Sequence, residues 1–134
     1  MIVGLLAILK AGGAYVPLDP TFDGSVHEIC SALCVGGSLH VLDDHVRMDQ
    51  AQLWNYLEKN SITHATLTPS VLQHHKHLAP LDTPLTILLA GEALPLALLK
   101  SLRELIPNGS IINDYGPTET TVDAIAWKCP DDFD

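Results

Sequence analysis

Short apolar runs alternate with amphipathic stretches along this chain of 134 residues, and glycine, proline, asparagine or aspartate stands near most of their ends. Runs of this kind, bounded by turn-forming residues, are typical of β-strands. They predict strands over residues 14–18, 38–42, 64–68, 85–89, 110–113 and 124–127. The run 85–89 is nearly continuous in apolar residues, which indicates a strand buried on both faces.

Stretches with helical periodicity separate these strands. They predict helices over 1–11, from Asp23 to about Val35, over 50–59, from Pro69 to about His77, and from Pro95 to Leu105. The two tryptophans, Trp54 and Trp127, are assigned to the core. Because strand and helix alternate with short loops, the predicted fold class is α/β, a mostly parallel sheet with flanking helices.

Two of the predicted strands end in unusual loops. The sequence LLAGEALP covers 88–95, and NDYGPTETT covers 113–121. In open parallel sheets, ligands bind outside the carboxyl ends of the strands. Both loops carry a glycine, which lets the backbone approach a ligand closely, and both carry a glutamate. We therefore expect the functional site at these two strand ends.

The second loop has the chemistry of a nucleotide site. Tyr115 offers an aromatic face to a planar ring, and Glu119 is a hard oxygen ligand of the type that Mg²⁺ takes. Hydroxyl groups suited to phosphate oxygens come from Thr118, Thr120 and Thr121. The loop predicts a magnesium–nucleotide site, although a polar turn that only caps a strand would explain its composition equally well.

Composition narrows the class of protein further. The net charge of −9, with only seven basic residues, argues against binding to a nucleic-acid backbone. No apolar run is long enough to span a membrane, and three cysteines fit a reducing cytoplasm better than a disulfide framework. The hydrophobic fraction of 47% can supply a core, while 17% charged residues is low, which indicates that more protein covers part of the surface.

Four motifs together resemble a known family. They are LKAGGAYVPLDP (9–20), FDGSVHEI (22–29), LLAGEALP (88–95) and NDYGPTETTV (113–122). In this order they are similar to successive core motifs of the amino-acid adenylation domains of nonribosomal peptide synthetases, which are AMP-binding, acyl-adenylate-forming ligases. The resemblance covers essentially the whole chain. It implies a reaction of an amino acid with ATP that yields aminoacyl-AMP and pyrophosphate.

The resemblance also implies roles for individual residues. The hydroxyl of Thr118 would meet the α-phosphate, Glu119 would bind Mg²⁺, and Asp23 would hold the α-ammonium group of the substrate. The adenine would be bound by Gly91, Glu92, Ala93, Asp114, Tyr115 and Gly116, with Tyr115 packed on its ring. The wall of the substrate pocket would come from Gly24, His27, Thr66, Leu88, Ala90, Asp114, Val122 and Asp123.

The acids of this wall bear on the substrate. Asp114 and Asp123 favour a basic or hydrogen-bonding amino acid, because a buried carboxylate needs a complementary donor. His27 is an alternative partner that would neutralise one of these acids.

The chain departs from the family pattern in two places. The family has a Lys-containing phosphate-binding loop between the VPLDP and FDxS motifs, but here Pro20 is followed directly by Thr21. We therefore expect an N-terminal segment, 1–20, then a deletion, then a substrate- and adenine-binding subdomain, 21–134. The family's C-terminal subdomain, with its ribose-binding carboxylate and catalytic lysine, has no counterpart either.

These departures predict little catalysis by the chain alone. Single donors to a developing anion are worth roughly 10²–10³ in rate, so the loss of several removes most of the catalytic power. In a fuller form the expected partners are carrier and condensation domains. Two alternatives stay open: a fragment of an acyl- or aryl-CoA ligase, for which Asp23 would have no purpose, and a non-catalytic folded remnant with residual nucleotide binding.

Overall fold

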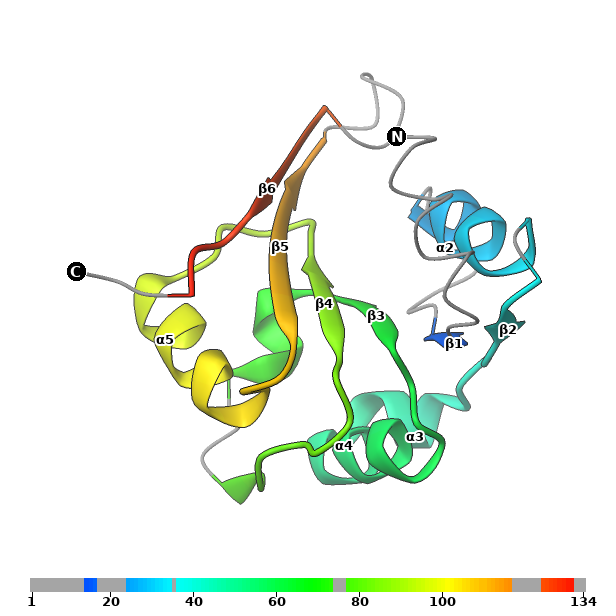
Figure 1. Ribbon diagram of the computed structural model, residues 1–134, viewed down its shortest axis with the longest axis horizontal. Helices are drawn as coiled ribbons and strands as arrows, with labels where there is room; N and C mark the ends of the chain where they lie inside the picture. The colour runs from blue at the N-terminus through cyan, green and yellow to red at the C-terminus, as the bar shows by residue number, and fades with distance from the viewer. Residues whose placement is uncertain (1–13, 17–23, 35, 74–76, 117–123, 132–134) are drawn as a thin grey trace.

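A computed structural model describes residues 14–16, 24–34, 36–73, 77–116 and 124–131, with backbone alone for 14–16 and 24–27 (Figure 1). The strands are β1 (Ala14–Val16), β2 (Ser38–Leu39), β3 (His64–Leu67), β4 (Thr86–Leu89), β5 (Ser110–Tyr115) and β6 (Ile125–Lys128). The helices are α2 (Gly24–Leu33), α3 (Asp44–Met48), α4 (Gln50–Lys59), the 3₁₀ helix η1 (Pro69–Leu72) and α5 (Leu96–Leu105).

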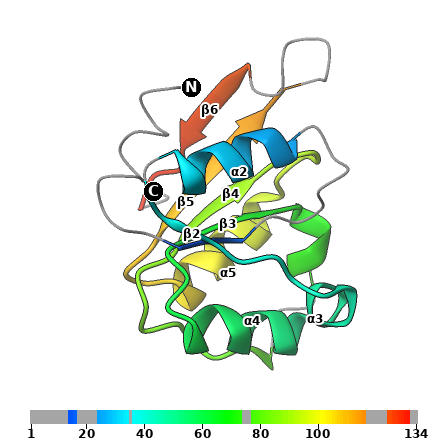
Figure 2. The ribbon, with the colours of Figure 1, turned by 90° about the vertical axis from the view of Figure 1, so that its right-hand side faces the viewer.

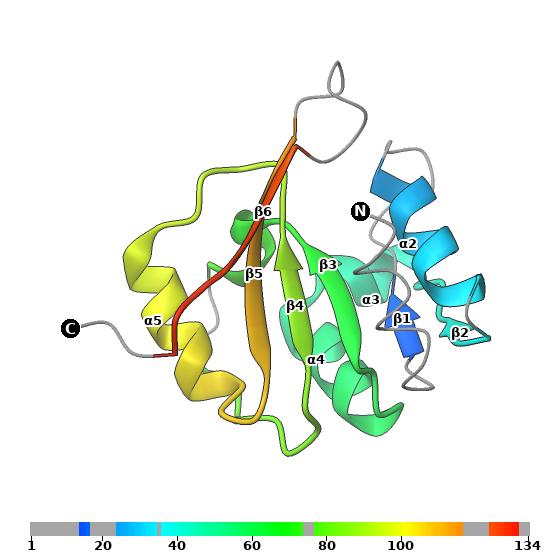
Figure 3. The same cartoon turned by 45° about the horizontal axis from the view of Figure 1, so that its top comes forward.

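The six strands form one sheet in the order β2-β1-β3-β4-β5-β6. All neighbouring pairs are parallel except β5 and β6, which are antiparallel (Figure 3). The carboxyl ends of β3, β4 and β5 therefore lie side by side at the same end of the strands. The predicted fold class, a mostly parallel α/β sheet with flanking helices, is confirmed.

Helices cover the two faces of the sheet unequally. Figure 2 shows α4 and α5 on one face and α2 on the other. The main core lies on the α4 and α5 face, where Leu57 and Leu102 pack with Ile87 of β4. Because side chains alternate along a strand, every second residue faces this core, and the residues between them face α2.

A side-chain cap explains why α4 begins at Gln50. The carboxylate of Asp49 accepts hydrogen bonds from the backbone N–H groups of Ala51 and Gln52, at 3.0 and 3.1 Å. These bonds satisfy donors that the first helical turn leaves without a partner. The hydrogen bonds from Gln52 are the main reason why the pKa of Asp49 is lowered.

Pairing with an antiparallel neighbour makes β5 longer than predicted. The sequence predicts a strand that ends at Asn113, but β5 continues to Tyr115, which pairs with Ile125 of β6. Asp114 and Tyr115 are therefore strand residues rather than loop residues. A strand gains backbone hydrogen bonds for as long as a neighbour is available, and the neighbour here is β6.

Other elements differ from expectation in length. The strand predicted over 38–42 is limited to Ser38 and Leu39, and the helix predicted from Pro69 appears as η1, which ends at Leu72. Helix α3 is additional. The helix predicted over 1–11 and the capping role of Asp23 lie outside the described residues.

The two tryptophans have different environments. Trp54 is 4% exposed and its indole N–H donates to the carbonyl of Ala79 at 2.8 Å, which confirms its core assignment. The assignment of Trp127 to the core is wrong, because its side chain is 52% exposed on β6, at the edge of the sheet.

In the part of the chain that is described, no helix has the length and apolar character needed to cross a membrane.

Candidate functional site

A cavity of about 380 Å³ opens at the carboxyl ends of β4 and β5. Its wall comes from the segment that follows β4 and from the end of β5. The lining residues are Gly91, Glu92, Ala93, Leu94, Asn113, Asp114, Tyr115 and Gly116. All six residues predicted to bind adenine lie in this wall, so the structure brings the two loops together as the sequence leads us to expect.

The end of β5 presents an aromatic ring at this cavity. Pairing with Ile125 fixes the backbone of Tyr115, while the Tyr115 side chain is 65% exposed. Most of the ring is therefore available to a planar ligand. Gly91, on the opposite wall, has a φ of +81°, a backbone conformation that glycine adopts without the strain that other residues incur.

Glu92 links the cavity wall to a different element. Its carboxylate accepts from the backbone N–H of Ser70 at 2.9 Å and from the hydroxyl of Ser70 at 2.7 Å. The hydroxyls of Ser70 and Thr68 lie 3.0 Å apart. The segment after β4 is thus tied to the start of η1, which follows β3.

Three residues of the predicted substrate wall share one face of the sheet. Thr66 and Leu88 are direct neighbours in the register of β3 and β4, on the face toward α2. Leu88 is paired with Ile112, so Asp114, two residues further along β5, shares this face. The side chain of Asp114 is 5% exposed. The structure therefore gathers three of the predicted wall residues on the face that α2 flanks.

The other residues of the predicted site are placed only in part. Ala90 directly follows β4, and its backbone N–H donates to the carbonyl of Leu67 at 3.2 Å. Gly24 and His27 belong to the first turns of α2, where the backbone alone is described. The remaining predicted residues, Asp23, Thr118, Glu119, Val122 and Asp123, lie outside the described residues, and with them the predicted metal ligand.

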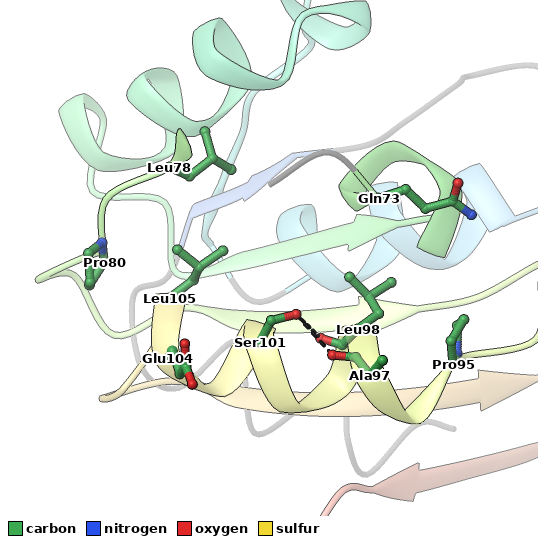
Figure 4. Close-up of a pocket in the computed structure, with 9 residues that line it drawn as sticks. All are labelled: Gln73, Leu78, Pro80, Pro95, Ala97, Leu98, Ser101, Glu104 and Leu105. Atoms are coloured by element: carbon green, nitrogen blue, oxygen red, sulfur yellow. Dashed lines mark hydrogen bonds between the residues drawn. The ribbon is translucent and has the colours of Figure 1, made fainter. Parts of the chain in front are cut away.

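A second, larger cavity lies away from these strand ends. It measures about 770 Å³, lies between α5 and the segment after η1, and shares no residue with the predicted site (Figure 4). Its lining includes Leu78, Leu98 and Leu105. Its polar members are Gln73, Ser101 and Glu104. The hydroxyl of Ser101 donates to carbonyls of its own helix. None of the residues that line this cavity belongs to the predicted site.

Ser70 is a residue that the sequence analysis missed. It stands in the stretch Thr68-Pro69-Ser70, where a proline that opens a helix is followed by a hydroxyl. That pattern marks a helix start but carries no indication of a partner 22 residues away.

The three cysteines, Cys30, Cys34 and Cys129, are free thiols.

Comparison with known proteins agrees with this geometry. The family of AMP-binding enzymes matches residues 21–134. Malpinin synthetase of Mortierella alpina is 47% identical over 108 residues, which are 81% of this chain and 1% of that protein. The hybrid PKS-NRPS synthetase pyvA of Aspergillus violaceofuscus is 34% identical over 119 residues, 82% of this chain and 3% of that protein.

The similarity extends to three-dimensional structure. The crystal structure of IdnL7 superposes with a TM-score of 0.79 at 27% identity, over 90% of this chain and 25% of that chain. The chain therefore spans a small part of the proteins that it matches. With a family match over 114 residues (21 to 134) and a relative at 47% identity, the chain belongs to the family of AMP-binding enzymes, among the adenylation domains of nonribosomal peptide synthetases.

Proposed function

We propose that this chain is the adenine- and substrate-binding part of an amino-acid adenylation domain. The reaction served is attack of the amino-acid carboxylate on the α-phosphorus of ATP, with release of pyrophosphate and formation of aminoacyl-AMP. The observation that carries the proposal is the cavity of about 380 Å³ between segment 91–94 and residues 113–116. Its volume lies within the range of about 300–1,000 Å³ that is typical of small-molecule sites.

The proposed site has two parts. The adenine would enter the cavity between segment 91–94 and residues 113–116, with its ring against Tyr115 and its edge along the backbone of 91–93. The amino acid would bind on the α2 side, against Thr66, Leu88 and Asp114. Both subsites then meet at the carboxyl ends of β4 and β5, where the substrate carboxylate must reach the α-phosphate.

The burial of Asp114 bears on the class of amino acid. Carboxylates in a pocket wall, here Asp114 together with Asp123, favour a ligand that brings a donor or a positive charge, because such a ligand offsets the cost of desolvating the acids when it binds. We propose a substrate with a basic or hydrogen-bonding side chain. Asp23 would hold its α-ammonium group, and His27, Ala90, Val122 and Asp123 would complete the wall with Gly24.

The phosphate end of the site rests on residues outside those described. Glu119 would bind the Mg²⁺ that neutralises the triphosphate, and Thr118 would donate to the α-phosphate. Since the family match begins at residue 21, directly after the predicted junction, it supports the division into a segment 1–20 and a subdomain 21–134. We expect nucleotide binding by this chain and little turnover without the phosphate-binding loop. In a longer cytoplasmic protein, carrier and condensation domains would be its partners.

Two measurements on the purified chain test the proposal. The first is titration with a fluorescent AMP analogue, with Tyr115→Ala as the variant expected to lose binding. The second is ATP–pyrophosphate exchange with pooled amino acids, with Glu119→Ala as control. Binding without exchange is the expected result. No binding by folded protein would contradict the proposal, and exchange above the control would contradict the predicted effect of the deletion.

A further inference from the structure

Segment 91–94 forms one wall of the cavity but has few anchors of its own. Gly91, Glu92 and Ala93 are exposed, while Leu94 packs partly against the core. The segment begins just after the backbone bond from Ala90 to β3. A short exposed segment of this kind opens readily unless further contacts hold it.

The side chain of Glu92 supplies such a contact. It accepts from the N–H of Ser70 at 2.9 Å and from the Ser70 hydroxyl at 2.7 Å, so both carboxylate oxygens bind one residue. Because the Ser70 hydroxyl donates to Glu92, its oxygen is left to accept from the hydroxyl of Thr68, 3.0 Å away. Hydrogen bonds that involve a charged partner are stronger than neutral ones.

The contact also completes the start of η1. Thr68 is the residue before this helix, and its side chain makes no capping hydrogen bond. The first N–H groups of a helix need an acceptor, and Glu92 provides it for Ser70 from 22 residues away. This contact therefore joins the start of η1 to the cavity wall.

The start of η1 is a firm point of attachment. Pro69 and Leu72 are buried, and the carbonyl of Val71 accepts from the side-chain amide of Gln50 in α4. Ser70 itself is not among the residues that line the described cavity. An effect of Ser70 on a ligand there would have to pass through Glu92.

We propose that Ser70 is a positioning residue that acts through Glu92 to hold the wall 91–94 of the adenine cavity in its binding shape. This inference rests on the proposed nucleotide site for its functional consequence. Ser70→Ala removes one of the two bonds to Glu92, and we expect the dissociation constant for the AMP analogue to rise by roughly three- to tenfold. Ser70→Thr keeps the hydroxyl and should restore binding.

The experiment combines hydrogen exchange of the free protein with titration of the AMP analogue. Variants Ser70→Ala, Ser70→Thr and the matched control Ser101→Ala, whose hydroxyl bonds only within α5 in the described contacts, are compared with the unchanged chain. We expect faster amide exchange over 91–94 in Ser70→Ala alone. In a Glu92→Ala background, Ser70→Ala should have no further effect, since their contact is already lost.

The two readouts separate the two proposals. If Ser70→Ala has the same amide exchange over 91–94 and the same dissociation constant for the AMP analogue as the unchanged chain, the positioning role is wrong. The proposed nucleotide site is unaffected by that result. Faster exchange with an unaltered dissociation constant would also overturn the positioning role. If the unchanged chain binds no nucleotide, the proposed function fails, whereas the exchange of 91–94 still decides whether Ser70 and Glu92 hold that wall.

Discussion

Two glycines near the ends of β4 and β5 differ in why a side chain would be costly. Gly91 has a φ of +81°, yet a Cβ there would meet only the methyl of Thr68 at 3.8 Å, which is ordinary contact. At Gly109, a Cβ would lie 2.2 Å from the backbone carbonyl oxygen of Leu85. At Gly91 the loss of stability would come from the backbone conformation. At Gly109 it would come from a steric clash with a backbone atom, which only a shift of the main chain could relieve.

This difference predicts unequal losses of stability. Gly91→Ala should lower the free energy of unfolding by about 1–2 kcal/mol, the cost of a left-handed conformation for alanine. Gly109→Ala should lower it by about 3 kcal/mol or more, because β4 and β5 must move apart at Leu85. Urea unfolding followed by circular dichroism measures both. Equal losses in the two variants would contradict the assignment of the two causes.

Tyr115 allows a test of the ligand site that leaves the fold intact. Its side chain is 65% exposed, so we expect Tyr115→Ala to change the free energy of unfolding by less than about 0.5 kcal/mol. Stacking of a base on an aromatic ring is worth about 1–3 kcal/mol, so the same change should weaken binding of an AMP analogue by roughly five- to 150-fold. Tyr115→Phe keeps the ring and should bind nearly as well as the unchanged chain. If Phe is as damaging as Ala, the ring does not stack on the base.

At the scale of elements, strand β3 carries a partly buried titratable group, His64, at its first residue. Burial lowers the pKa of His64 from its ordinary value of 6.5, and its Nδ1 lies 2.9 Å from the hydroxyl of Thr63. Above pH 6.5 the ring is neutral in the folded and unfolded chain alike. As the pH falls below 6.5, the unfolded chain binds the proton first, so protonation favours unfolding.

The contribution of His64 to stability is therefore complete above about pH 6.5 and is lost as the pH falls toward the lowered pKa of the folded state. Within that window the free energy of unfolding should fall by up to about 1.4 kcal/mol per pH unit for this one proton. His64→Gln should show a shallower fall, and His45→Gln, at an exposed position of α3, should match the unchanged chain. Urea unfolding between pH 5 and 8 is the measurement, and identical profiles for all three proteins would refute the prediction.

Elements with a strong local signal could be predicted from the sequence. Helix α4 begins and ends at the predicted residues because Asp49 caps it and its apolar residues share one face. Helix α3 has five residues, DHVRM, and no buried side chain, so it carries no periodic pattern to detect. Strand β2 is short for a different reason: among the described residues, only Ser38 and Leu39 pair with β1.

Long-range pairing limited what could be predicted of the site. The meeting of 91–94 with 113–116 followed from the rule for strand ends in parallel sheets. The bond between Ser70 and Glu92 could not follow from any local pattern, because it depends on how η1 lies beside the segment after β4. Likewise, the alternation in β6 did not reveal that Trp127 would face solvent at the sheet edge.

At the scale of the whole molecule, β6 is an unprotected edge in the described part of the chain. All four of its residues are exposed, among them Ile125 at 64% and Trp127 at 52%. The register with β5 puts both of these side chains on the same face as Tyr115. Large apolar side chains next to unpaired backbone groups favour pairing with another chain.

We therefore expect the purified chain to self-associate through this edge as its concentration rises. Trp127→Lys and Ile125→Lys should reduce association, because a charge on an edge strand must be desolvated when a second strand docks. The free energy of unfolding of each variant should lie within about 0.5 kcal/mol of that of the unchanged chain, since both positions are exposed.

Met48→Lys, at an apolar residue of α3 that is 80% exposed, is the matched control and should not alter association. Sedimentation velocity over a concentration series is the measurement. Two results would show that the β6 edge is not the associating surface. One is a chain that stays monomeric at every concentration, and the other is a loss of association in Met48→Lys as large as in Trp127→Lys.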